Sequence, residues 1–295
     1  MRGFKGLVAA AAVLVTLSAC SGVTVGDDLV VESPGKGGEE GSTAPYDGPL
    51  KAKTPEWVVE DSPLEGGGAS LLTLECAGEL FEGGPGNYGG GDSGGESSPD
   101  AALQQHLSAS QMWRITPERG YRVERRSGNR VLFSYDVGGR TRAAVIVAEN
   151  LKGKDGWIAE TYALCDPSEF RAAERADLDL RVWSDEQGRP VPTTKVNSSM
   201  GPKHCDWQSV EILHLGRDKA QRQYFRDPEA KFAGSDLLNS RYEDDVPMPG
   251  DATDTGFRYQ GRELWLAGDK KDAYVRVDGD HVERWPGAKE RIGCA

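Results

Sequence analysis

The chain has 295 residues, of which 37% are hydrophobic, 28% are charged and 38 are glycine. Such a composition is typical of a soluble protein rich in loops, and it excludes a protein that crosses a membrane many times. The formal net charge of −12 excludes nucleic acid as an expected partner, because the protein would repel its phosphates.

The first twenty residues have the pattern of an export signal. A short basic segment precedes an apolar run at residues 7–17, which is too short to cross the ~30 Å hydrocarbon core of a bilayer as a helix. Leu17-Ser18-Ala19-Cys20 follows, and this string resembles the bacterial lipoprotein signal. The resemblance implies that residues 1–19 are a signal peptide and that the Cys20 thiol is acylated with diacylglycerol. The alternative is an ordinary secretory peptide in which this cysteine is incidental.

The lipid-anchor hypothesis predicts where the protein resides. Two acyl chains give a stable membrane anchor, so we expect the chain on the outer face of the cytoplasmic membrane, in the extracytoplasmic space. Removing residues 1–19 takes away two positive charges, which disfavours electrostatic attachment to anionic lipid. Residues 20–55 are rich in Gly, Ser, Pro and acidic residues and predict a disordered tether.

The remaining cysteines predict disulfides. They are Cys76, Cys165, Cys205 and Cys294, an even number that outside the cytoplasm suggests two disulfides in one of three connectivities. Residues 76 and 165 are 89 positions apart, as are residues 205 and 294. We therefore expect the pairs Cys76–Cys165 and Cys205–Cys294, each closing a domain-sized loop.

Residues 56–165 predict an α+β domain. Ser97 and Asp100 form a capping pattern at the start of a helix. Alternating apolar residues separated by glycine-containing turns then predict four strands, at 121–126, 130–136, 141–149 and 156–164. The expected fold is a helix followed by a four-stranded antiparallel meander. The glycine-rich residues 82–98 predict a surface loop.

The second half of the chain predicts a mainly β domain. Residues 166–204 suggest a connecting hairpin with strands at 178–183 and 190–196. Residues 205–295 form the expected second domain. Its strands are predicted at 208–215, 221–225, 262–267, 273–277 and 281–285, with a turn-rich excursion at 227–254.

Four strings in the chain resemble those of a known group of proteins. They are Val131-Leu132-Phe133-Ser134-Tyr135-Asp136-Val137-Gly138-Gly139-Arg140, His204-Cys205-Asp206-Trp207-Gln208-Ser209, Glu263-Leu264-Trp265-Leu266 and Glu283-Arg284-Trp285-Pro286. They look like uncharacterised actinobacterial secreted proteins and lipoproteins, from about Ser70 onward. The resemblance implies an exported Gram-positive protein and brings no activity with it.

Two classes of function remain open. A non-catalytic binding or accessory module of the cell envelope would need an exposed ligand surface, for which Trp207, Trp265 and Trp285 are weak candidates. A hydrolase acting on a glycan or peptide would, on a glycan, need two carboxylates about 5–10 Å apart. The sequence offers carboxylates such as Glu211, Glu263 and Glu283, but among 47 acidic residues chance pairs are common.

Other motifs point to no specific chemistry. Asp251, Asp254, Asp278 and Asp280 lie beside glycines and could suit calcium, but none has EF-hand spacing, and such residues are common in turns. Gly91-Asp92-Ser93-Gly94-Gly95 matches the letters around a serine-protease nucleophile. All four histidines follow Ser93, however, which is not the order of that family. The sequence therefore predicts no catalytic residue, cofactor or metal site, and binding is the expected function.

Overall fold

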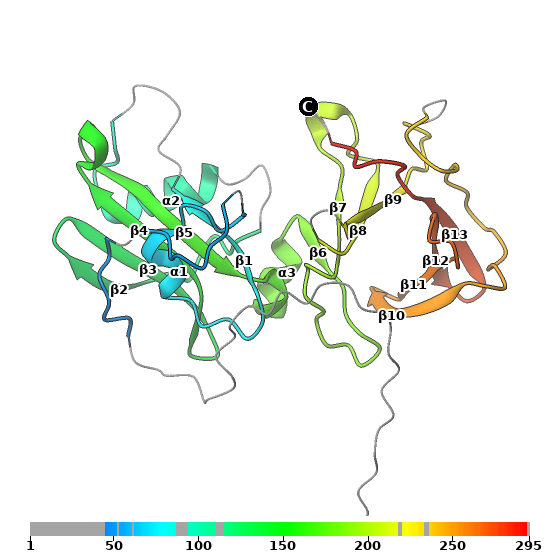
Figure 1. Cartoon of the computed structure of the whole chain (residues 1–295), viewed down its shortest axis with the longest axis horizontal. Coiled ribbons are helices and arrows are strands. Elements are labelled where there is room, and N and C mark those ends of the chain that lie inside the picture. The colour runs from blue at the N-terminus through cyan, green and yellow to red at the C-terminus, as the bar shows by residue number, and fades with distance from the viewer. Residues whose placement is uncertain are drawn as a thin grey trace, which may run out of the picture. The chain divides into compact units, whose positions relative to one another are not determined.

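The computed structural model describes residues 45–293 except 52, 61, 87–93, 110–114, 218–219 and 233–235. Cys20, the expected signal peptide and most of the expected tether lie outside the described residues. In the part described, the chain forms three antiparallel sheets with few helices (Figure 1). The fold is therefore mainly β, with its α-helices before residue 178.

The first sheet confirms the predicted meander. Its strands are β1 (Leu80–Pro85), β2 (Arg122–Ser127), β3 (Arg130–Val137), β4 (Arg140–Glu149) and β5 (Trp157–Cys165). They lie in the order β1-β5-β4-β3-β2. The middle eight residues of β4 are all buried, as expected for a central strand that is apolar on both faces.

Strand β1 corrects the prediction of a surface loop at residues 82–98. Residues 82–85 pair antiparallel with β5, so they belong to the sheet. A Cβ added at Gly83 would lie 3.2 Å from the Ala163 Cβ and 2.9 Å from a Leu71 methyl carbon. The glycines that suggested a loop therefore allow β1 to pack closely between its neighbours.

Helices cover both faces of the first sheet. Ala69 of α1 (Gly68–Leu72) packs with Leu132 and Ile146. Leu103 of α2 (Pro99–Ala109) packs with Val131 and Val145, which point to the opposite face because successive strand residues alternate. This places the sheet in the middle of three layers.

The predicted helix at Ser97 is confirmed as α2, but the capping residue differs. The Ser98 hydroxyl oxygen accepts a hydrogen bond from the Ala101 N–H at 3.2 Å, so Ser98 provides the cap. Within α2, His106 packs against the Tyr162 ring, and burial lowers its pKa to about 4. His106 is therefore neutral at physiological pH and belongs to the core.

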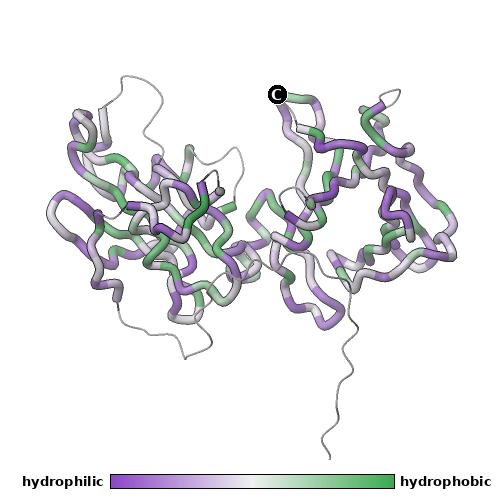
Figure 2. Tube along the Cα trace, viewed as in Figure 1, coloured by the Kyte–Doolittle hydropathy of each residue, from purple (hydrophilic) through white to green (hydrophobic). Residues whose placement is uncertain are grey.

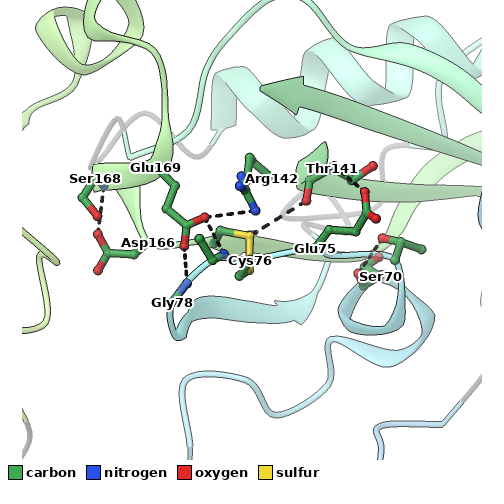
Figure 3. Close-up of a disulfide and its surroundings, with 12 residues drawn as sticks. Ser70, Glu75, Cys76, Gly78, Thr141, Arg142, Asp166, Ser168 and Glu169 are labelled. Carbon is green, nitrogen blue, oxygen red and sulfur yellow. Dashed lines mark hydrogen bonds and ion pairs between the residues drawn. A yellow bond between two sulfur atoms is a disulfide. The ribbon is translucent and has the colours of Figure 1, made fainter. Parts of the chain in front are cut away.

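A disulfide fastens the segment just before β1 to the end of β5. Cys76 and Cys165 are bonded, with their Cα atoms 5.4 Å apart. The Glu169 carboxylate accepts hydrogen bonds from the backbone N–H groups of Ala77 and Gly78 and forms an ion pair with Arg142 at 3.0 Å (Figure 3). The covalent link is thus reinforced by a polar cluster around the same turn.

The second predicted disulfide is not part of the described structure. Among the described residues one disulfide is present, Cys76–Cys165, where the sequence predicted two. The partner predicted for Cys205 is Cys294, which lies outside the described residues. The pair Cys205–Cys294 therefore stays a prediction.

Buried Asp166 joins the end of the first sheet to the second half of the chain. Its carboxylate accepts hydrogen bonds from the backbone N–H of Ser168 and from the backbone and hydroxyl of Thr193. A longer bond comes from the Thr194 N–H at 3.3 Å. One carboxylate therefore fixes residues just after β5 against the loop that precedes β7.

The second half of the chain contains two four-stranded sheets. One consists of β6 (Leu180–Val182), β7 (Val196–Met200), β8 (Glu211–Leu215) and β9 (Arg222–Arg226), and the other of β10 (Thr253–Tyr259), β11 (Arg262–Leu266), β12 (Asp272–Asp278) and β13 (His281–Pro286). The short helices in this half and before it are α3 (Ala172–Asp177) and the 3₁₀ turns Leu151–Gly153, Pro167–Glu169 and Lys203–Cys205. The predicted mainly β character is confirmed.

Two details of this half differ from the prediction. The expected connecting hairpin at 166–204 contributes β6 and β7 to the same sheet as β8, and β7 begins where the predicted strand ends, at Val196. Strand β10 was missed, because it follows the turn-rich excursion and carries Gly256 in its middle. Figure 2 shows hydrophobic and hydrophilic residues interspersed along this half of the chain.

The two sheets share one core. Trp183 and Leu213 on one side pack with Leu264 and Trp285 on the other. Paired backbone hydrogen bonds between Ser184 and Arg258, and an isolated bridge between Tyr224 and Gly287, link the two sheets along opposite flanks. Residues 180–287 therefore form one closed β unit.

Candidate functional site

The three predicted tryptophans do not form an exposed patch. Trp285 is completely buried in the core between the sheets, so its assignment to a ligand surface is wrong. Trp207 packs against Phe232, with ring centroids 4.9 Å apart, in a separate cluster. Trp265 points away from the core, and the Arg276 guanidinium lies 4.9 Å from its ring. The three tryptophans therefore do not make up a shared aromatic binding surface.

Two buried glutamates connect the sheets through arginines. Glu211 of β8 accepts a hydrogen bond from Arg262 of β11 at 2.8 Å and also pairs with Arg181. Glu283 of β13 accepts two parallel hydrogen bonds from Arg226 of β9, at 2.8 and 2.9 Å. Each sheet thus supplies the glutamate of one ion pair and the arginine of the other. We call these four residues, Glu211, Arg226, Arg262 and Glu283, the crossed ion pairs.

The crossed ion pairs are unsuited to proton donation. Burial alone would raise the pKa of Glu211, but hydrogen bonds from Arg181 and Arg262 outweigh it and hold that pKa below the usual range. The pKa of Glu283 is likewise low, because hydrogen bonds from Arg226 and Trp285 outweigh its burial. Both carboxylates are ionised at neutral pH, whereas a glycosidase needs one carboxylic acid with a raised pKa.

The pH dependence of stability provides a test of this assignment. Because the folded pKa of Glu283 lies below its unfolded value, its stabilising effect is present above the ordinary glutamate pKa of about 4.3 and is lost as the pH falls through the folded pKa. We expect the free energy of unfolding, measured with urea, to decrease as the pH drops below about 5, and we expect this decrease to be smaller in E283Q. The exposed Glu290→Gln variant should retain the wild-type slope, and equal slopes in both variants would contradict the assignment.

Asp254, one of the acidic residues considered as calcium ligands, is engaged elsewhere. Asp254 forms two hydrogen bonds with the guanidinium of Arg258, at 2.6 and 2.8 Å. One group of possible ligands in the described part of the chain joins Asp244, His281 and Glu283. His281 is hydrogen-bonded to Asp244 at 2.6 Å, while Glu283 is held by Arg226. These contacts leave little coordinating capacity for a cation.

The residue set with the clearest capacity for a ligand is a basic hollow beside β9. It has a volume of about 660 Å³ and is lined by parts of three segments, 221–224, 270–271 and 287–291, together with Asn239. Five of these twelve residues are basic and one, Glu290, is acidic. The basic residues are Arg222, Lys270, Lys271, Lys289 and Arg291. We call this site the basic hollow.

The backbone of the basic hollow is fixed by hydrogen bonds between its segments. The Tyr224 hydroxyl donates to the Lys270 carbonyl at 3.0 Å, and the Gly287 N–H donates to the Lys271 carbonyl at 3.0 Å. A Cβ at Gly287 would lie 2.2 Å from that same carbonyl oxygen, so only glycine allows the segments to approach this closely. The charged side chains therefore project from a rigid frame.

A second hollow, near the start of the described chain, has the opposite character. Its lining includes Glu56, Glu60 and Glu65, and the exposed side chains of Trp57 and Val59 belong to the same segment. Its acidic lining matches the overall negative charge of the protein. It therefore stands out less from the rest of the surface than the basic hollow does.

Comparison with known proteins gives no relative from which a function could be transferred. No protein-family model matches the chain, and neither a curated protein nor a solved structure matches it. In the described ranges, no helix has the length and apolar character needed to cross a membrane. The function must therefore be inferred from the chain itself.

The basic hollow was missed in the sequence because its residues are dispersed. Lys270 and Lys271 are adjacent, and Lys289 and Arg291 are two residues apart, but Arg222 precedes the first pair by almost fifty positions. Each pair alone is an ordinary surface feature. A search for basic pairs in an otherwise acidic chain could have marked the two lysines and the segment at 289–291, but not their convergence.

Proposed function

We propose that this protein is a lipid-anchored binding or accessory module of the cell envelope, exposed outside the cytoplasmic membrane through Cys20. The observation that carries the binding function is the basic hollow, a concentration of positive charge on a protein whose net charge is −12. The lipoprotein-like string that ends at Cys20 supports the location. Membership of the actinobacterial group of secreted lipoproteins is part of the same proposal.

Binding is favoured over hydrolysis by the state of the carboxyl groups. In the described part of the chain, the carboxyl groups with shifted pKa values, such as Glu211, Glu283 and Asp254, are all shifted downward. Glu263, another carboxylate considered for catalysis, forms an ion pair with Arg276 at 2.9 Å. These groups stabilise the fold as anions, which supports a non-catalytic protein.

The predicted anchor and the predicted binding site can be tested together. In cells that produce the full chain, labelled palmitate should be incorporated into the wild-type protein and not into C20A. Purified full-length protein in a nonionic detergent should sediment with isolated cell envelopes, and the K270E/K289E variant should sediment about tenfold less. The two substitutions change the lining from five basic residues and one acidic residue to three of each, without touching the core.

Two outcomes would overturn parts of this proposal separately. Absence of palmitate from the wild type would remove the lipid anchor and leave the binding function intact. Equal sedimentation of the wild type and K270E/K289E would remove the basic hollow as the binding site. The lysines that serve as a matched control are Lys51 and Lys53, which are exposed beside the first sheet, and K51E/K53E should sediment like the wild type.

A further inference from the structure

We infer that the basic hollow binds a hydrophilic ligand that carries several phosphate groups. This inference rests on the proposed binding function and names the chemical class of the ligand. It begins from a contrast in composition. Lysine and arginine make up 35 of the 295 residues and are outnumbered by 47 acidic residues, yet five of the twelve residues that line the hollow are basic.

The positive charge of the hollow is only partly neutralised by the protein. Arg222, Lys270, Lys289 and Arg291 are exposed, and they form no ion pair with another residue that the structure describes. Lys271 is the exception, with Asp269 at 3.8 Å. Asp272, the next acidic neighbour, accepts a hydrogen bond from the Ser240 hydroxyl. Even when Asp269, Asp272 and Glu290 are all counted, cations remain in excess.

This excess contrasts with the other arginines of the same β unit. Arg226 and Arg262 are satisfied by buried glutamates, and Arg258 is satisfied by Asp254. The arginines that stabilise this β unit are thus paired with carboxylates. Cations left unpaired around one concave site raise the local potential and attract an anion from solution.

The size of the hollow indicates more than one anionic group. Its volume of about 660 Å³ lies within the range of sites for small organic ligands, roughly 300–1,000 Å³, and far exceeds that of a single phosphate ion. The cations come from three separate segments of the chain, so a ligand in the hollow can contact more than one of them. A molecule with several negative charges along its length fits this distribution.

The lining also indicates a hydrophilic ligand. Its uncharged side chains are those of Gln221, Gln223, Asn239, Tyr224 and Ala288, and the Tyr224 ring is itself buried. An acidic peptide would be expected to use at least one apolar anchor, for which this lining provides no pocket. Arginine offers paired donors to a phosphate and lysine a compact charge, so their mixture suits the phosphate groups of a hydrophilic molecule.

Titration calorimetry on the full chain in nonionic detergent tests the ligand class. Soluble inorganic polyphosphate stands for a phosphate-bearing polymer, mixed micelles containing lyso-phosphatidylglycerol stand for a lipid headgroup, and polyglutamate stands for an acidic polypeptide. We expect polyphosphate to bind more tightly than polyglutamate, and its binding to weaken as ionic strength rises. K270E/K289E should bind it about tenfold more weakly or worse, whereas K51E/K53E should match the wild type.

Each alternative outcome has a defined meaning. Tighter binding of micelles than of polyphosphate would retain the phosphate class and identify a lipid source. Stronger binding of polyglutamate, equal binding by K270E/K289E and wild type, or no binding of any phosphate probe would overturn the inference. If envelope sedimentation still depends on Lys270 and Lys289 in that last case, the proposed function stands and only the ligand class is wrong. Matching thermal unfolding midpoints will establish that both variants are folded.

Discussion

Replacement of both Cys76 and Cys165 by alanine should lower the free energy of unfolding by about 4–5 kcal/mol. The disulfide joins residues 89 positions apart, so its removal returns a large loop-closure entropy to the unfolded chain. The effect should appear in urea unfolding followed by tryptophan fluorescence, to which Trp157, at the other end of β5 from Cys165, contributes. A loss of this size is comparable to the total stability of many domains.

The single variants provide the control for this prediction. If loop closure is the source of stability, Cys76→Ala and Cys165→Ala should each lose as much as the double variant, because either change opens the loop. Losses that add up instead would indicate that each side chain contributes through its own packing. A double variant within about 1 kcal/mol of the wild type would show that the cluster around Glu169 holds β1 in place without the covalent bond.

The second large effect should follow from Arg226→Met. This change removes every hydrogen bond that Arg226 donates to Glu283, a carboxylate whose side chain is 3% exposed. A buried charge left without its partner costs about 3–5 kcal/mol, and the partial exposure of Arg226 places the expected loss near the lower bound. Urea unfolding at neutral pH measures it directly.

Two further variants isolate the charge as the cause. Arg226→Lys keeps a cation near Glu283 but loses the paired geometry, so its cost should be smaller, about 1 kcal/mol. Glu283→Gln introduced into R226M removes the unpaired charge and should recover part of the lost stability. Failure of this second change to recover any stability would show that R226M acts through packing and not through the carboxylate.

The first sheet could be predicted because its signals are local. Alternation in β3 and the apolar run at residues 143–148 of β4 are typical of strands, and the glycine turn between the two strands fixes the meander. Strand β1 could not be found this way. Glu82, Gly83 and Gly84 lack strand propensity, and they pair with β5 because the disulfide and close packing place them there.

The candidate site could not be predicted from the sequence, for a related reason. The local sequence does not tell whether the Trp285 side chain faces solvent or the core. Its orientation is set by the pairing of β12 with β13. The lysines at 270 and 289 become neighbours through contacts between chain segments, such as the hydrogen bond from Gly287 to Lys271. A property that depends on convergence of distant segments leaves no local pattern.

The crossed ion pairs have a consequence for how the two facing layers find their alignment. Glu211 lies opposite Arg226 within one layer, while their partners Arg262 and Glu283 belong to the other. If one sheet shifted relative to the other by a single residue, both buried carboxylates would lose their arginine partners at the same time. Apolar side chains alone would specify the alignment less strictly. The ion pairs therefore favour one alignment of the two sheets and destabilise the neighbouring ones.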